Sequence, residues 1–251
     1  MKKYYLTNRQ LLKVFLIILI VMVVSILIVA LRPVQVVYFT EEQLETLDLK
    51  KHSILVIKPL LTANAYKKGG FYDYYNGTCD EKCLTVDIDT NIPYKFTSSL
   101  KTIVRLEALG ADTITDYELS KDTSMLVRYN TIVMLHSEYV TKNLFYALES
   151  HPHVIYLYPN ALYAEVEIKD GKMTLIRGHG YPTPDIHNGF GWKHDNTHPY
   201  EYDTSCTDLQ FYDIPNGKML NCYPENFVLN NTIIFKFLKD NSGEKIFAWK
   251  N

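Results

Sequence analysis

The tetrapeptide His136-Ser137-Glu138-Tyr139 carries the side chains best suited to chemistry. It ends an apolar run, residues 129–135 (YNTIVML), which predicts a buried strand. An imidazole and a carboxylate at a strand end can move protons during a reaction, so we predict His136 and Glu138 as catalytic residues. Ser137 is a poor nucleophile candidate, because no Gly-x-Ser-x-Gly turn surrounds it. The structural alternative is that Glu138 only caps the following helix or pairs with a neighbouring loop.

A second group of candidates lies in a histidine-rich segment. Four of the eight histidines fall within residues 179–198, among glycines and prolines that indicate an irregular loop. Imidazole and carboxylate side chains crowded in this way can bind zinc or iron, although no helical HExxH pair is present. Aromatic and hydrogen-bonding residues together also suit a saccharide or peptide ligand. A third interpretation is that the histidines are simply exposed. The candidate binding residues here are His179, His187, Trp192 and His194.

Buried strands and amphipathic helices alternate between residues 52 and 158. The expected strands are 52–58, 112–115, 129–135 and 153–158, and the expected helices are 98–109 and 141–150. Strands that are apolar on both faces and alternate with helices are typical of an α/β fold with a parallel sheet flanked by helices.

Sites in such folds form at the carboxyl ends of the strands. Three expected loops leave that edge, at 116–119, 136–141 and 159–163. We therefore predict that one cavity, covered by the histidine-rich segment, is lined by the binding candidates Tyr117 and Asn160 and by His136 and Glu138.

The C-terminal third of the chain, after Tyr163, is predicted to be rich in β-strands. Asp170-Gly171 and Asn216-Gly217 each separate two short strand-like runs and predict two hairpins. Residues 232–238 (TIIFKFL) predict a closing strand. Residues 62–95 predict a long surface insertion. The abundance of tyrosine, 20 residues, does not by itself indicate a binding surface.

An unbroken apolar run at residues 14–31 indicates the compartment. At about 1.5 Å per residue, a helix of this length spans about 27 Å, close to the hydrocarbon core of a bilayer. Lys and Arg before the run place the N-terminus in the cytoplasm. A cleaved signal peptide is the alternative, but its apolar core is usually shorter. The predicted domains are a cytoplasmic N-terminus (1–13), a transmembrane helix (14–32), a tether (33–51) and an extracellular α/β domain (52–251).

Four cysteines, all beyond the apolar run, agree with an exterior domain. An even count allows two disulfides. We predict the local pairs Cys79–Cys83 and Cys206–Cys222, because each closes a short, turn-rich loop. A four-thiolate zinc site is the alternative, and the CxxxC spacing fits it poorly.

Sequons and charge narrow the expected partners. Asn76 and Asn230 begin Asn-x-Thr sequons and are predicted glycosylation sites of an exterior domain. The net charge is −2, and Lys and Arg do not cluster beyond the N-terminus, so nucleic acid is not an expected partner. The expected partners are membrane lipid, through the N-terminal helix, and a cell-surface protein or glycan.

Three segments between about residues 106 and 166 carry a family resemblance. They read LEALGADTITDYEL, YNTIVMLHSEYVT and HVIYLYPNALYAEV. They resemble the C-terminal domain of N,N-dimethylformamidase large subunits, which has the class I glutamine-amidotransferase-like fold. The sequence HSEY at a strand end is the most specific element of the match.

This resemblance implies a class I amidotransferase-like, or flavodoxin-like, α/β fold. It also implies iron held by two tyrosines and a glutamate. Tyr139 stands where one such tyrosine is expected, and Tyr117 is the candidate for the other. The chain departs from the wider fold family because no cysteine nucleophile stands at the strand-to-helix turn. Glutaminase chemistry is therefore not expected.

The sequence allows two functions. The first is a membrane-anchored extracellular α/β domain that acts as a non-catalytic binding or structural module of the cell surface. The second is a metal-dependent hydrolase of amide or other C–N bonds, related to dimethylformamidase, with iron or zinc as its cofactor. Stoichiometric metal in the purified protein would favour the second.

Overall fold

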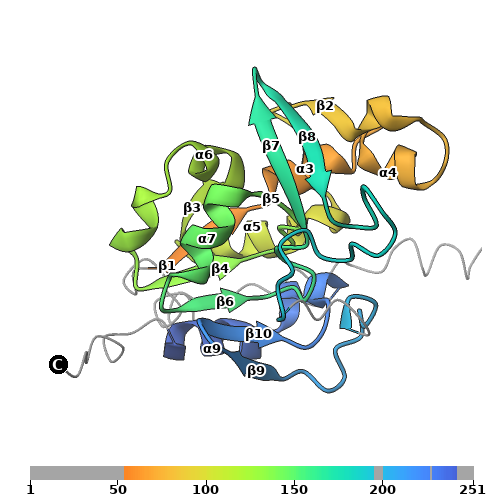
Figure 1. The fold of residues 1–251 in the computed structure, drawn as a ribbon. Coiled ribbons are helices and arrows are strands. Elements are labelled where there is room, and N and C mark those ends of the chain that lie inside the picture. Colours follow the sequence, from red (N-terminus) through yellow and green to blue (C-terminus); the bar gives the residue numbers. More distant parts are fainter. Residues whose placement is uncertain (1–53, 195–199, 227, 242–251) are drawn as a thin grey trace, which may run out of the picture. The chain divides into compact units, whose positions relative to one another are not determined.

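The computed structural model describes residues 54–194, 200–226 and 228–241 (Figure 1). The chain divides into two compact units, Met1–Phe39 and Thr40–Asn251, and every described residue belongs to the second unit. The expected transmembrane helix and tether lie outside the described residues. Within the ranges given above, no helix is long and apolar enough to cross a membrane.

A six-stranded sheet forms the centre of the second unit (Figure 1). Its strands, in order, are β3 (Asp112–Thr115), β1 (Ile54–Lys58), β4 (Thr131–Met134), β6 (Val154–Tyr156), β10 (Gly217–Leu220) and β9 (Phe211–Ile214). All neighbours are parallel except β10 and β9, which form the predicted second hairpin. Every residue of β4 and β6 is buried, as expected for strands covered on both faces. The predicted parallel α/β architecture is therefore confirmed.

A smaller mixed sheet meets the first one. Its strands, in order, are β2 (Thr85–Asp87), β8 (Lys172–Arg177), β7 (Ala164–Lys169) and β5 (Tyr139–Thr141). β7 and β8 form the predicted hairpin, which projects away from the central sheet (Figure 1). Its turn residues Asp170 and Gly171 both have positive φ angles, 50° and 74°, as the tight turn requires. Only residues 135–138 separate β4 from β5, so Glu138 lies where the two sheets meet.

Helices connect and cover these strands. They are α3 (Leu60–Ala65), α4 (Phe71–Tyr75), α5 (Leu100–Ala108), α6 (Asp116–Lys121), α7 (Lys142–Glu149) and α9 (Thr232–Asn241). α5 and α7 occupy the predicted ranges. α5 follows Ser99, which has a left-handed φ of 60°, and ends before Gly110, whose φ is 81°. Glycine adopts that angle without steric cost, which explains why the helix stops there.

The strand predicted for residues 232–238 is wrong, because this segment belongs to α9. The buried residues of α9 are Ile234, Phe235 and Leu238, which share one helical face, whereas Ile233 is exposed. A short apolar run has the same composition in a buried strand and in a helix, and only its burial pattern separates them.

The loop predicted at residues 116–119 is also wrong, because these residues begin α6. The side chain of Thr115 accepts a hydrogen bond from the backbone of Glu118, and the Glu118 side chain accepts one from the backbone of Thr115. This reciprocal capping box starts the helix.

The segment 62–95 is built into the fold and is not a surface insertion. All six residues of α3 are buried. Farther along the segment, β2 pairs with β8 and so completes the smaller sheet. The residues that follow β1 therefore pack between the two sheets' elements as part of the fold, and their side chains can contribute to a site.

The four cysteines form the predicted disulfides, Cys79–Cys83 and Cys206–Cys222. No free cysteine is left in the described part of the chain. Two disulfides indicate an oxidising, extracellular-type compartment. Of the two sequon asparagines, Asn76 is exposed, and the side chain of Asn230 lies outside the described ones.

Removal of the longer disulfide should destabilise the fold. Cys206 and Cys222 are 16 positions apart. Their joint replacement by Ser should lower the free energy of unfolding by about 3 kcal/mol, because the unfolded chain regains the entropy of an open loop. Urea denaturation measures the loss. The same change at Cys79 and Cys83, which are 4 positions apart, is the control and should cost less. Equal losses would contradict the loop-length explanation.

Candidate functional site

A cavity of about 530 Å³ opens at the carboxyl ends of the central strands, with Glu138 at its floor. Only 2% of Glu138 is exposed. The described residues that line the cavity are mostly aromatic or titratable: Tyr66, Tyr72, Phe96, Thr97, His136, Glu138, Asn160, Tyr163, His179, Glu201, Tyr202, Thr204 and Tyr223.

Helix α3 fixes the backbone of Glu138. The buried Thr62 hydroxyl oxygen accepts hydrogen bonds from the N–H groups of Glu138 (2.9 Å) and Tyr139 (3.3 Å). The helix is itself held at its first turn, where the N–H of Leu61 donates to Oδ1 of the Asp116 carboxyl group at 3.0 Å. The connection after β1 therefore positions the chain that leaves β4.

Two phenols bind the Glu138 carboxylate. Tyr72 Oη donates to Oε1 at 2.9 Å, and Tyr66 Oη lies 3.1 Å from Oε2. The two phenol oxygens are 2.5 Å apart, and their rings stack with centroids separated by 3.8 Å. Burial and the negative charge of Glu138 raise the pKa of both phenols far above its ordinary value. Both hydroxyls are therefore protonated donors at neutral pH.

Two imidazoles flank the same carboxylate. His179 Nδ1 lies 3.3 Å from Glu138 Oε1, and His136 Nε2 lies 3.7 Å from Oε2. His136 Nδ1 is 2.8 Å from the carbonyl oxygen of Thr97, which assigns the proton to Nδ1 and a lone pair to Nε2. Nε2 also contacts the side-chain amide of Asn160.

The charge states follow from this arrangement. Burial lowers the pKa of His136, so its imidazole is neutral. Burial alone would raise the pKa of Glu138, but the interactions with His179, His136 and Tyr72 outweigh it, and the net shift is downward. The cavity floor therefore holds an ionised carboxylate beside a neutral imidazole at neutral pH.

A layer of buried groups supports His136 from behind. The Tyr158 ring stacks against the imidazole with centroids 5.9 Å apart. Tyr158 Oη is held at 2.6 Å by the carboxylate of Glu225, which also accepts the N–H of Lys101 at 2.7 Å. The neighbouring Tyr223 forms part of the cavity wall, and its N–H donates to the carbonyl of Asp203 at 2.9 Å.

The donor set at the floor fits a metal ion of the kind that the family resemblance implies. The hydroxyls of Tyr75 and Tyr139 and Nδ1 of His179 are buried and complete no hydrogen bond of normal geometry with the described residues. Carboxylate and phenol oxygens are hard ligands and imidazole is an intermediate one, a combination that suits iron. No group of three His, Cys, Asp or Glu able to hold a metal occurs in the described ranges. A metal here would therefore depend on Glu138 and on the phenols of Tyr66 and Tyr72, which would have to give up their protons to bind it.

The structure brings some of the predicted residues together and separates others. His136, Glu138, Asn160 and His179 line the cavity. The buried Tyr139 lies behind the floor, where its ring packs edge-on against Phe71.

The other four predicted binding residues lie away from this cavity. Tyr117 is on α6, where its ring packs under the Lys121 ammonium at 3.9 Å. His187 supports the backbone of the loop, since its carbonyl accepts the N–H of His179. Trp192 is buried in the hydrophobic core under the central sheet, with His194 at its edge. Within the described part of the histidine-rich segment, residues 179–194, His179 is therefore the only histidine that lines the cavity.

The most informative site residues, Tyr66 and Tyr72, were not predicted. They lie in YKKGGFYDYY, a segment whose dense tyrosines were the one available signal. In the sequence, Tyr66 is separated from Glu138 by 72 positions and Tyr72 by 66 positions. No local sequence pattern encodes contacts over such separations.

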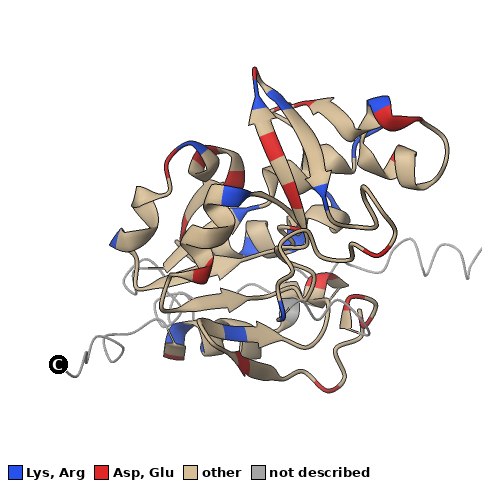
Figure 2. Ribbon diagram, viewed as in Figure 1, with Lys and Arg blue, Asp and Glu red and all other residues tan. Residues whose placement is uncertain are grey.

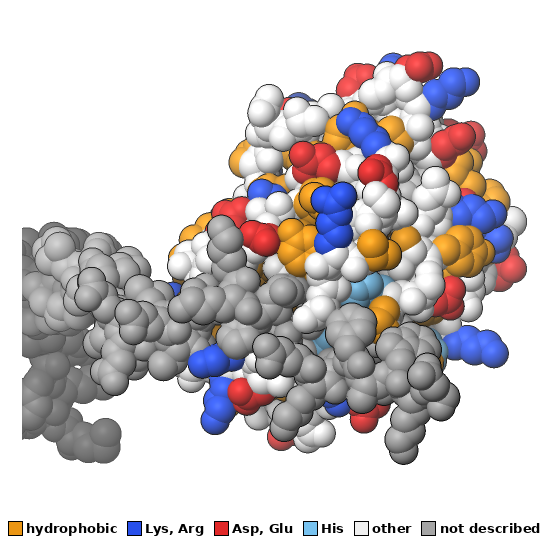
Figure 3. Space-filling model, turned by 90° about the vertical axis from the view of Figure 1, so that its left-hand side faces the viewer, with side chains coloured by type: hydrophobic (Ala, Val, Ile, Leu, Met, Phe, Trp, Pro, Cys, Tyr) orange, Lys and Arg blue, Asp and Glu red, His pale blue; other side chains and the backbone are white. Residues whose placement is uncertain are grey.

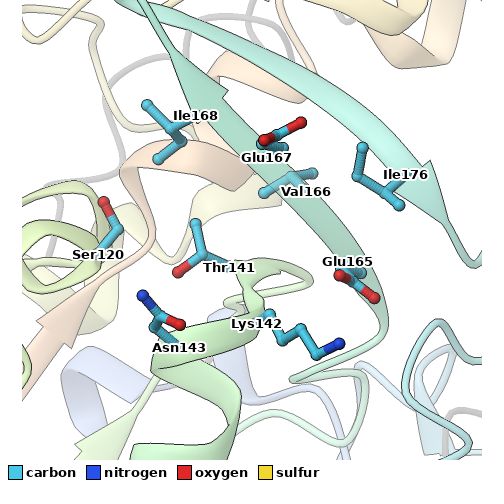
Figure 4. A pocket seen from close by; sticks show the side chains of 9 residues that line it. All are labelled: Ser120, Thr141, Lys142, Asn143, Glu165, Val166, Glu167, Ile168 and Ile176. Atoms are coloured by element: carbon cyan, nitrogen blue, oxygen red, sulfur yellow. The ribbon is translucent and has the colours of Figure 1, made fainter.

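A second hollow, of about 460 Å³, lies between β7 and the start of α7 (Figure 4). Lys142, Glu165 and Glu167 project from its walls beside aliphatic side chains. Lys142 and the two glutamates carry opposite charges, but the described lining of this groove has no buried titratable side chain. This groove is therefore a weaker candidate for a reaction centre than the Glu138 cavity.

Charge on the outer surface is mixed. Basic and acidic positions alternate over most elements, and acidic residues follow one another along β7 (Figure 2). On the face seen in Figure 3, Lys and Arg side chains are interspersed with Asp and Glu. Any charge selectivity of the Glu138 cavity must therefore come from its own lining.

No protein-family model matches the chain, and no curated protein matches it.

Proposed function

We propose that the chain is a metal-dependent hydrolase of an amide or related C–N bond, with the Glu138 cavity as its active site. The observation that carries this proposal is the convergence of two phenols and two imidazoles on one buried carboxylate. Buried, coupled titratable groups in a cleft are typical of reaction centres. The parallel sheet, with Glu138 just after its strand β4, also supports a class I amidotransferase-like fold.

The residues of the cavity have separate roles in this proposal. Tyr66, Tyr72 and Glu138 would hold the metal ion, which would displace the two phenol protons into solvent and, when bound, would polarise a carbonyl and acidify water. His136 Nε2 accepts a proton from the water whose oxygen bonds to the amide carbon. The C–N bond then breaks, and His136 returns the proton to the leaving amine. Asn160, whose buried Oδ1 has no hydrogen-bond partner among the described residues, orients the substrate amide.

Metal analysis of the full chain tests the proposal. The purified protein should contain iron or zinc at about one ion per chain, and Tyr72→Phe should lose most of it, because the variant removes one ligand oxygen. Tyr117→Phe is the matched control and should keep the metal, since Tyr117 lies off the cavity. A metal-free protein that still folds would contradict the hydrolase.

The second candidate function is a non-catalytic binding or structural module of the cell surface. It is favoured by the pairing of all four cysteines, which leaves no thiol nucleophile in the described residues. We also propose that residues 14–32 anchor the chain, with the α/β domain outside the cell and open to a surface protein or glycan. Protease added to intact cells should then digest the domain; protection until the membrane is permeabilised would contradict this orientation.

A further inference from the structure

The opening of the Glu138 cavity differs in chemistry from its floor. Tyr202 is 75% exposed and Phe96 is 42% exposed, so these rings mark the opening. Phe96 stacks on Tyr223 with centroids 5.4 Å apart, and the Tyr223 hydroxyl donates to the Phe96 carbonyl at 2.9 Å. The rings of Phe96 and Tyr223 are thus held against each other before any ligand arrives.

The described lining of the cavity holds carboxylates but no lysine or arginine. The carboxylates are those of Glu138 and Glu201. Glu201 lines the same cavity as the exposed Tyr202. With the charge of Glu138 taken up by a metal ion at the floor, Glu201 still leaves the opening negative.

Aromatic faces beside a carboxylate select cations. The face of an aromatic ring is electron-rich and attracts an ammonium group within about 6 Å of its centroid. A carboxylate or phosphate ligand would meet no positive side chain here and would be repelled by Glu201. A volume of about 530 Å³ suits a small organic molecule.

We propose that the substrate of this site carries an alkylated ammonium group, which docks between Glu201 and the rings of Phe96, Tyr202 and Tyr223 while its C–N bond reaches Glu138. This inference rests on the proposed function, because it names the substrate class of the same site.

Calorimetric binding to the full chain in detergent tests the proposal with two probes of equal shape. Choline carries a trimethylammonium group, and 3,3-dimethylbutanol replaces its nitrogen by carbon. Choline should bind at least tenfold more tightly than the alcohol, and the preference should fall with added salt. Glu201→Gln should remove most of the preference. Glu167→Gln, which deletes an exposed carboxylate of the other groove, should leave it unchanged.

A second variant guards against a local effect of Glu201→Gln on the loop. Phe96→Leu keeps an apolar side chain but removes a ring, so choline should bind several-fold more weakly while the alcohol is little affected. Equal binding of the two probes, absence of choline binding, or an unchanged preference in both variants would overturn the inference.

The outcome can be separated from that of the proposed function. Choline preference in a protein that holds no metal and hydrolyses no amide would support the cation site and contradict the hydrolase. Metal binding and amide hydrolysis without choline preference would contradict only the cation site.

Discussion

Replacement of Glu138 by Gln should abolish amide hydrolysis by the full chain and leave its fold intact. Glutamine has nearly the same shape, and its one carbonyl oxygen can still accept a phenol hydrogen bond, but it lacks the charge that holds a metal. Loss of the group that organises proton transfer should lower kcat by at least about 100-fold. Amine release from N,N-dimethylformamide, together with metal content, measures the effect.

Glu165→Gln is the matched control for this prediction. It removes a carboxylate from the groove of Figure 4, outside the Glu138 cavity, and should retain both metal and activity. An unchanged thermal midpoint in Glu138→Gln would show that the loss is not caused by unfolding. If Glu138→Gln hydrolysed the amide as fast as the parent protein, the Glu138 cavity would not be the active site.

Stability should fall as pH rises because of Asp116. This side chain is fully buried, and burial raises its pKa to about 8. In the unfolded chain the pKa is about 3.9. Between these two pKa values the folded protein keeps a proton that the unfolded chain has lost, so the free energy of unfolding falls as the pH rises. Asp116→Asn cannot titrate and should be more stable than the parent at high pH, by about 3 to 4 kcal/mol more at pH 8 than at pH 5.

Urea denaturation of both proteins across that pH range gives the difference curve. The neutral histidines His136, His151 and His153 have lowered pKa values and act with the opposite sign, since their contribution is lost as pH falls through about 6.5. They are common to both proteins and cancel in the difference. A flat difference curve would mean that Asp116 is ionised in the folded state near neutral pH.

Much of the central sheet could be predicted from the sequence because its signals are local. The runs that became β1, β4 and β6 are apolar on both faces, and the Asp-Gly and Asn-Gly pairs mark both hairpins. The wrong prediction at α9 also arises from reliance on a local signal. TIIFKFL is a short apolar run that fits the periodicity of a strand and that of a helix. At α6, the capping pair Thr115 and Glu118 was present in the sequence and predicts the helix.

The candidate site could be predicted only in part. His136, Glu138 and Asn160 follow strands of one parallel sheet, and strand order alone brings such residues to one edge. Tyr66 directly follows α3, and Tyr72 lies in α4. The position of α3 depends on the contact of Leu61 with Asp116 and of Thr62 with the β4–β5 connection. Those contacts arise from tertiary packing, so neither hydrophobic periodicity nor a sequence motif predicts them.

The Cys206–Cys222 bond ties together two segments at the opening of the Glu138 cavity. One end of the bond adjoins Tyr223, and the other follows Tyr202 and Thr204, so both flank residues that line the cavity opening. The N–H of Cys206 also donates to Asp203, whose carbonyl accepts the N–H of Tyr223. A chain in which this bond is reduced would lack the tie, so we expect it to be latent until oxidation assembles the opening. Choline binding that is weakened by mild reduction and restored by reoxidation would reveal this latency; binding indifferent to the redox state would argue against it.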